Sequence, residues 1–222
     1  MTIEVRQVRD FDRVRLQGPG ILTIRQSNKE CLTIHAPRYA IDGLQSRVVD
    51  GELLLGLLNA PVVSLQLHRE VLSYDLQVKD LSRLQLTGSA RAIIADLDTD
   101  RLTLVVSGAG KIRVEKLTAD HLDINIKRSG QVQVSGDVEA QLVRVGHQGV
   151  YRAGQLISDF AELSVADLGQ ATITVNEALN VAISGNGSVT YVGYPEVQQV
   201  ISGPGRLQRG KAARKRRAEE HG

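Results

Sequence analysis

The feature that most constrains this chain is a turn of small residues that returns about every twenty residues. In the second half of the chain the turns end at Ala90, Gly110, Gly130, Gly149, Gly169, Gly187 and Gly205, with spacings of 20, 20, 19, 20, 18 and 18 residues. A short period of this kind is typical of a solenoid, in which each repeat forms one coil and packs only on its neighbours.

Around each turn, aliphatic and mostly polar residues alternate with a period of two. The fourth residue before the turn residue is aliphatic in every repeat: Leu16, Leu86, Val106, Ile126, Val145, Val165, Ile183 and Ile201. The sixth residue before the turn, and the second and fourth after it, are also mostly apolar, and Gln199 is the polar break. This alternation predicts two half-buried strands joined by a tight corner, because helical spacing would not produce it.

One repeat has too few apolar side chains to enclose a core by itself. Stacking the repeats would place Leu86, Val106 and Ile126 above one another and close a continuous core. We therefore predict an all-β fold: a right-handed parallel β-helix or β-roll solenoid with coils of about 18–20 residues. A third inward column is expected from four residues with less regular spacing, Leu97, Leu117, Val138 and Leu156.

Glycine recurs at the corners, where the chain must turn tightly or approach the next coil closely. The predicted structural turn glycines are Gly18, Gly20, Gly108, Gly110, Gly130, Gly149, Gly169, Gly185, Gly187, Gly203 and Gly205. Those just before the turn residue, such as Gly18 and Gly108, are expected to have positive φ.

The chain reads as one β-helical domain over 1–209, followed by a basic flexible tail over 210–222. Within the domain, regular coils are expected over 80–209 and irregular N-terminal coils over 8–79. In the irregular part we predict strands at 31–34, 53–58 and 62–67, with turns at 50–51 and 59–61. The tail has no apolar residue except alanine, so it cannot dock on a core.

The charge is concentrated in the tail. Of the 27 basic and 25 acidic residues, five basic and two acidic ones lie in the last thirteen residues, so the body carries 22 basic and 23 acidic residues. A near-neutral body argues against a nucleic-acid platform, and the tail is expected to be solvated. No signal peptide or membrane-spanning segment is visible, which predicts a cytoplasmic location if the chain is complete.

The sharpest polar column is Asp80, Asp100 and Asp120, spaced twenty residues apart. Stacked carboxylates are a candidate for acid/base catalysis or for a Ca²⁺ site with oxygen ligands. The alternative is that Asp is used to cap turn backbone, and it is favoured because the column stops at Ala140 and has no basic column beside it. We therefore expect no catalytic residues, no cofactor and no metal site.

The other polar and aromatic residues offer little chemistry. The histidines, His35, His68, His121, His147 and His221, have no metal-ligand spacing, and the corner residues Arg128 and His147 are expected to be solvated. Aromatic residues make up 3% of the chain. Tyr151 and Tyr191 fall in inward columns, and Tyr194 is expected to pack over the end of the stack, which leaves little surface for an aromatic sugar platform.

Several segments in order resemble one known family. They are FDRV at 11–14, GPGILTIRQ at 18–26, the SGxG corners at 107–110 and 184–187, and VTYVGYP at 189–195. The chain resembles the auto-transporter adhesin head GIN domains over about residues 8–209. The resemblance implies a β-helix-like fold and an adhesive role at the cell surface or in the periplasm, and it brings no catalytic residues.

These observations favour a non-catalytic structural or adhesive interaction module, with a protein surface or a second copy of the chain as its partner. One alternative is a cytoplasmic scaffold that self-assembles end to end, since uncovered β-helix ends carry free strand edges. A further alternative is a polysaccharide-acting β-helix enzyme that uses Asp80, Asp100 and Asp120.

Overall fold

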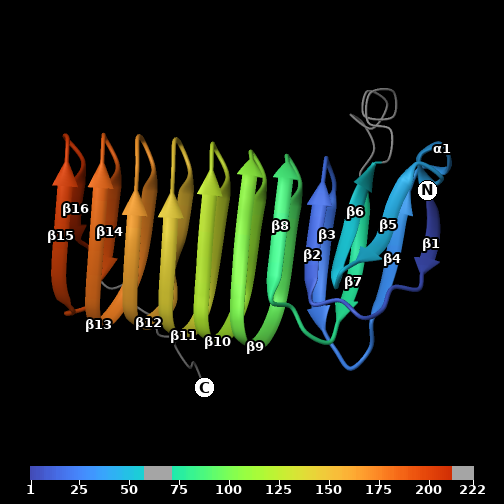
Figure 1. The fold of residues 1–222 in the computed structure, drawn as a ribbon, viewed down its shortest axis with the longest axis horizontal. Coiled ribbons are helices and arrows are strands. Elements are labelled where there is room, and N and C mark those ends of the chain that lie inside the picture. Colours follow the sequence, from blue (N-terminus) through green and yellow to red (C-terminus); the bar gives the residue numbers. More distant parts are fainter. Residues whose placement is uncertain (58–71, 212–222) are drawn as a thin grey trace, which may run out of the picture.

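In the computed structural model, which describes residues 1–57 and 72–211, the chain forms a column of stacked coils (Figure 1). Five long strands each run along both sides of one coil and bend between them. They are β9 (Arg91–Gly108), β10 (Lys111–Lys127), β11 (Gln131–Val145), β12 (Val150–Val165) and β13 (Gln170–Ser184). The last coils are built from β14 (Ser188–Val192), β15 (Glu196–Ser202) and β16 (Arg206–Arg209). One tight corner therefore separates each strand from the next.

Neighbouring coils pair in parallel and in register. Leu86 lies opposite Val106, and Val106 lies opposite Ile126, with all three side chains at most 1% exposed. Paired residues are 18 to 20 positions apart, as in Arg91–Lys111 and Ser188–Arg206, except in a short irregular stretch of the β12–β13 pairing. The predicted parallel β-solenoid with coils of this length is confirmed.

The first coil of the column does not stack in chain order. It consists of β2 (Arg13–Gln17) and β3 (Ile21–Gln26). On one side it pairs in parallel with β8 (Arg83–Gly88) and β9, and on the other side with β6 (Glu52–Leu57) and β7 (Ser73–Val78). The chain thus leaves the first coil, builds the N-terminal end of the column, and returns to the opposite side of that coil.

Antiparallel strands and a short helix form the N-terminal end. The strand β4 (Cys31–Ala36) pairs with β7, β5 (Leu44–Val49) pairs with β6, and β1 (Thr2–Arg6) pairs with β4. Between β4 and β5, helix α1 (Arg38–Ile41) buries Ala40 and Ile41 against the core. The strand predicted at 31–34 is present, and so is the described part, 53–57, of the strand predicted at 53–58. The predictions at 59–61 and 62–67 lie outside the described residues.

The third inward column differs from the prediction at one position. Leu117 pairs with Leu97 on one side and with Gly136 on the other, and Gly136 pairs with Leu156. Val138 lies instead between Ala119 and Ser158. The prediction of Val138 in this column is wrong because irregularities in the β10–β11 and β11–β12 pairings shift the register near Gly136. With φ at +127°, a Cβ on Gly136 would lie 2.1 Å from the Leu117 carbonyl oxygen.

Among the described residues, no helix is long and apolar enough to cross a membrane. Of the predicted tail at 210–222, only Gly210 and Lys211 belong to the described part of the chain, and the rest of that prediction lies outside it.

Candidate interaction surfaces

The acidic column lies on the bend that joins the two sides of the coils. Asp100 and Asp120 stand on neighbouring coils, between the aligned pairs Thr99–Ala119 and Arg101–His121. Asp80 precedes β8, and all three carboxylates are exposed. None of them has a hydrogen-bond or ion-pair partner within residues 1–57 and 72–211. In the same part of the chain, no three His, Cys, Asp or Glu side chains come together as metal ligands.

The predicted turn glycines meet two different demands. Gly18, Gly20, Gly108, Gly185 and Gly203 have positive φ. At Gly108, where φ is +154°, a Cβ would lie 2.5 Å from the Gly88 carbonyl oxygen of the neighbouring coil. The glycines at the turn residue itself leave room for the core: a Cβ on Gly130 would lie 2.5 Å from Val106 Cγ1.

Three middle coils use larger residues where the other coils use a positive-φ glycine. Arg128, His147 and Asp167 have φ of 67°, 55° and 57°. His147 Nδ1 lies 3.3 Å from Asp167 Oδ2, with both side chains more than half exposed. A groove of about 530 Å³ runs along these corners. Because the pair is exposed, it contributes little to stability.

A buried polar network interrupts the aliphatic core between β11 and β12. The Tyr151 hydroxyl donates to Gln141 Oε1 at 3.0 Å, and the Gln141 amide donates to Ser158 Oγ at 2.7 Å. Ser158 in turn donates to the Thr174 carbonyl oxygen at 3.1 Å. Burial raises the pKa of Tyr151 far above its ordinary value. The sequence signal was a break in an inward column, because Gln141 lies between Leu122 and Ala161.

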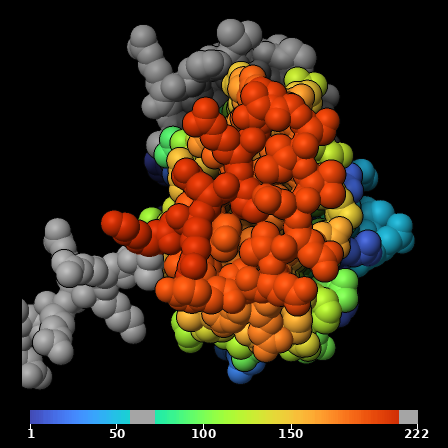
Figure 2. Space-filling model, turned by 90° about the vertical axis from the view of Figure 1, so that its left-hand side faces the viewer, coloured from blue at the N-terminus to red at the C-terminus, as the bar shows by residue number. Residues whose placement is uncertain are grey.

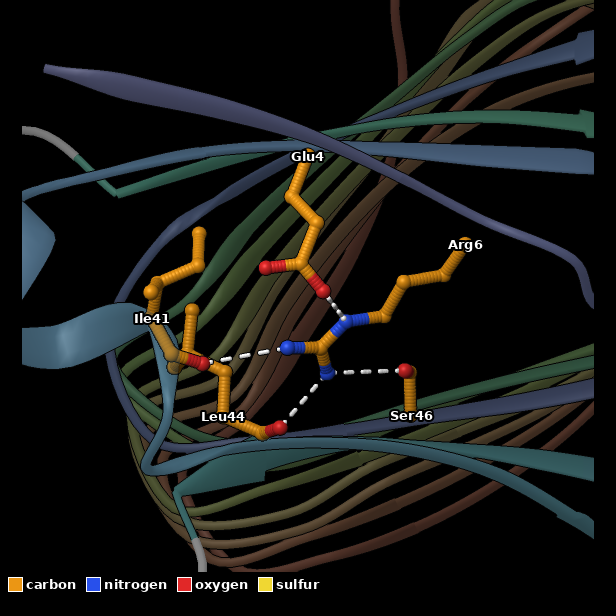
Figure 3. Close-up of polar contacts among 5 residues, drawn as sticks. All are labelled: Glu4, Arg6, Ile41, Leu44 and Ser46. Atoms are coloured by element: carbon orange, nitrogen blue, oxygen red, sulfur yellow. Dashed lines mark hydrogen bonds and ion pairs between the residues drawn. The ribbon is translucent and has the colours of Figure 1, made fainter.

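At the N-terminal end, a hydrogen-bonded arginine closes the core (Figure 3). Arg6 on β1 donates to the Leu44 carbonyl oxygen at 2.6 Å, the Ile41 carbonyl oxygen at 3.0 Å and Ser46 Oγ at 2.9 Å. Its Nε donates to Glu4 Oε1 at 2.6 Å. Because β1 and β5 belong to opposite sides of the column, Arg6 ties the two sides together across the end of the core.

Close to this arginine lies a tyrosine whose hydroxyl is unpaired. Tyr74 is fully buried, and its hydroxyl has no hydrogen-bond partner. Burial raises the pKa of Tyr74 far above its ordinary value, and the charge of Arg6 opposes this rise. An unpaired buried hydroxyl lowers the free energy of unfolding, so the Tyr74 hydroxyl destabilises the fold locally.

At the C-terminal end, the last coil faces outward without an antiparallel cover among the described residues (Figure 2). Its inner row has Gln199 where the preceding coil has Val181, and Arg209 where that coil has Tyr191. Ile201 is 39% exposed. Tyr194 is 87% exposed with Arg209 over its ring at 3.4 Å, so the expectation that Tyr194 covers the end is wrong.

One side of the column carries two outward rows without an acidic residue. The rows come from the strand segments that follow each corner, and the register aligns them from β3 to β16. One row is Ile21, Arg91, Lys111, Gln131, Val150, Gln170, Ser188 and Arg206; the other is Thr23, Ile93, Arg113, Gln133, Arg152, Thr172, Thr190 and Gln208. We call these two rows the basic face, since their five charged residues are all cationic.

The opposite side and the bend have a different character. The side that precedes each corner mixes both charges, with Asp123 and Glu162 among its outward residues. It also exposes Phe160, which is 42% accessible and stands between Ala140 and Ala178. The bend carries most of the remaining acids of these coils, namely Asp96, Asp98, Asp100, Asp120, Asp137, Glu139, Asp159 and Glu177. The near-neutral body is therefore strongly divided by sign.

Comparisons with known proteins agree with this architecture. Residues 10–195 match the family described as "Putative auto-transporter adhesin, head GIN domain". A solved structure of a putative adhesin from Bacteroides fragilis has a TM-score of 0.85 at 22% identity, covering 95% of this chain and 96% of that one.

Two further solved structures share the fold. A putative lipid binding protein from Parabacteroides distasonis has a TM-score of 0.77 at 21% identity, covering 94% of this chain and 96% of that one. A putative adhesin from Parabacteroides merdae has a TM-score of 0.73 at 19% identity, covering 94% and 95%. No curated protein matched the sequence.

Proposed function

Because this chain belongs to the family of auto-transporter adhesin head GIN domains, we propose that it is a non-catalytic adhesive module that binds through the flat sides of its column. The observation that carries this proposal is the register of the coils, which aligns outward side chains in long, exposed rows on a rigid core. Rows of this kind suit contact with an extended surface. The family favours a cell-surface or periplasmic location over the cytoplasmic one expected from the sequence.

Bead adhesion tests this function. Beads coated with the protein are passed over immobilised cell envelopes, epithelial monolayers and matrix proteins, with albumin-coated beads as reference. The adhesive module predicts retention well above albumin on at least one surface. A matched coating of Ile126→Asp protein, whose core is broken, should lose that retention. Retention at the albumin level on every surface would contradict the proposal.

Self-association is a second candidate, and the C-terminal end favours it. The outer edges of β15 and β16 pair with no strand of the described residues, and Val200 and Ile201 are exposed on β15. At the N-terminal end the outer edges of β1 and β5 likewise pair with no described strand, but Arg6 ties the two sides together there. The geometry therefore favours a discrete pair joined at C-terminal ends over a filament. Sedimentation velocity distinguishes these outcomes: dimers support the pair, long polymers support the scaffold, and monomers at all concentrations contradict both.

The enzymatic alternative has its own test. Hydrolysis or cleavage of any member of a polysaccharide panel, lost in Asp100→Ala but kept in Asp98→Ala, would support carboxylate catalysis on the bend. The adhesive proposal predicts no turnover by the wild-type protein.

A further inference from the structure

We infer that the basic face is the binding site of an extended acidic polysaccharide. This inference rests on the proposed adhesive function and names the class of ligand that the module binds. The juxtaposition that carries this inference is a group of four cations within four successive coils, one on β9, two on β10 and one on β12. Arg91 and Lys111 are register neighbours, and Arg113 and Arg152 belong to the adjacent row. A groove of about 380 Å³ runs among these side chains.

Ion pairs within the described residues account for one of the four cations, Arg113, and leave the other three without an acidic partner. Among the described residues, Arg91 and Lys111 have no ion-pair partner, although they stand on neighbouring strands about 4.8 Å apart. Arg113 lies 3.6 Å from Glu115 at the rim, and Arg152 donates to Gln131 Oε1 at 3.4 Å. Like charges directly opposite each other destabilise a sheet. An anionic ligand laid along this face would offset that repulsion.

The core does not require this distribution of charge. Both sides of each coil follow the same alternation and bury the same kinds of aliphatic residue, yet one side has acids and the basic face has none. Acidic residues are instead collected on the bend. Between β3 and β16, the two rows therefore offer an anionic chain a path without an acidic side chain in either row. Charge complementarity of this kind guides the orientation of binding.

The uncharged neighbours indicate a polysaccharide. The same rows continue with Gln131, Gln133, Gln170, Thr172 and Thr190, whose amides and hydroxyls donate and accept hydrogen bonds as sugar hydroxyls require. The two outward rows contain no aromatic side chain on which nucleic-acid bases could stack. The low aromatic content argues against sugars stacking on aromatic rings. Binding by charge and hydrogen bonds does not need such rings.

The geometry sets the expected spacing of contacts. Arg113 and Arg152 are two coils apart in one row, which is about 10 Å at the usual distance between strands. A chain laid along the column would meet Arg91 and Lys111 in one row and the other two in the next. We expect at least four coils to be needed, so short oligosaccharides should bind much more weakly than long ones.

The test measures binding of polygalacturonate oligomers by calorimetry at two salt concentrations, with neutral dextran and duplex DNA as comparisons. The variant carries Arg91→Gln, Lys111→Gln, Arg113→Gln and Arg152→Gln. A matched control removes four exposed cations from the other surfaces: Arg101→Gln, Lys116→Gln, Lys127→Gln and Arg144→Gln. Both variants change the net charge equally, and melting curves check that each remains folded.

We expect the basic-face variant to bind about 30-fold more weakly, as four exposed ion pairs would predict, while the control changes less than threefold. Equal losses in both variants would overturn the site, as would binding of dextran. Binding of DNA as tight as that of polygalacturonate would overturn the assignment to polysaccharides. If beads adhere and the basic-face variant adheres equally well, the site is wrong but the adhesive function stands. If beads fail to adhere while polygalacturonate binds at this face, the adhesive function is wrong.

Discussion

At the N-terminal end of the column, β1 turns Glu4 and Arg6 toward the core, and Arg6 reaches three oxygen atoms on the opposite side. At the C-terminal end, Gln199 and Arg209 also replace apolar residues of the inner row, but no strand of the described residues lies across them. Both ends therefore become polar where the stack stops. Only the N-terminal end is tied across, which makes it the firmer of the two.

The difference bears on function because a solenoid can bind through its ends or its sides. The N-terminal end, which Arg6 ties across, disfavours continuous end-to-end growth. The sides remain, and of these the basic face is the one with a single sign of charge. Changes at the ends and in the middle of the column should therefore separate stability from binding.

The largest expected effect comes from placing a charge in the inner row of a middle coil. Ile126→Asp should cost more than about 4 kcal/mol, because Ile126 is 1% exposed and the carboxylate would have no partner. Ile201→Asp in the last coil should cost less than about 1 kcal/mol, since that side chain is already 39% exposed. Urea unfolding measures both, and equal costs would contradict the open C-terminal end.

Removing the arginine of the closed end should have the next largest effect. Arg6→Ala leaves the Ile41 and Leu44 carbonyl oxygens without this donor and should cost about 2 kcal/mol. Arg209→Ala at the other end removes an exposed contact with Tyr194 and should cost about 0.5 kcal/mol. If Arg6→Ala and Arg209→Ala lower the free energy of unfolding by the same amount, the two ends of the column are equally well tied.

Alkaline pH should destabilise the fold through its two buried tyrosines. The pKa values of Tyr74 and Tyr151 are raised in the folded protein, so both favour the neutral form. Their contribution is complete below the unfolded pKa of about 10 and decreases above it, by about 1.4 kcal/mol per pH unit for each tyrosine. Melting temperatures measured between pH 9 and pH 11 should fall less steeply with pH in the Tyr74→Phe, Tyr151→Phe double variant than in the wild type. If both fall equally steeply, groups other than these tyrosines cause the loss of stability.

At neutral pH the same two tyrosines should respond in opposite directions. Tyr74→Phe removes an unpaired buried hydroxyl and should raise the free energy of unfolding by about 1 kcal/mol. Tyr151→Phe breaks the bond to Gln141 and should lower it by about 1 kcal/mol. Chemical denaturation of the two single variants checks the signs, and a loss in both would mean that Tyr74 has a partner in solution.

The smallest expected effect is the replacement of the polar break in the last coil. Gln199→Val restores the aliphatic column above Val181 and should change the stability of the monomer by less than about 0.5 kcal/mol. It should, however, promote dimerisation at high concentration, because the exposed end becomes more apolar. Sedimentation equilibrium of this variant and of Gln198→Val, an outward control, tests the role of Gln199 in keeping the end soluble.

Much of the architecture follows from local patterns in the sequence. The alternation around each corner predicts the strands, and the period predicts which residues stack, as in Leu86, Val106 and Ile126. The order of the first coils could not be predicted in this way. The pairing of Val14 with Leu84 spans a long segment of chain, and no local signal says on which side of the first coil that segment packs.

Other features depend on side-chain geometry that a repeat pattern does not contain. Gly136 takes the place in the third column because local irregularities in the strand pairing shift the register next to it. Gln141 is visible as a break in an inward column, but its partners Ser158 and Tyr151 are known only once the coils are stacked. The basic face likewise emerges only when outward residues are aligned coil by coil.

Chemical footprinting is the most direct test of binding through the side of the column. Lysine acetylation and arginine modification are followed by mass spectrometry with and without long polygalacturonate. If the polysaccharide binds along the basic face, Lys111, Arg91, Arg113 and Arg152 should lose reactivity, while Arg144 on the opposite side and Arg209 at the C-terminal end keep theirs. Protection of Arg209 with an unchanged Lys111, or equal protection on all surfaces, would contradict it.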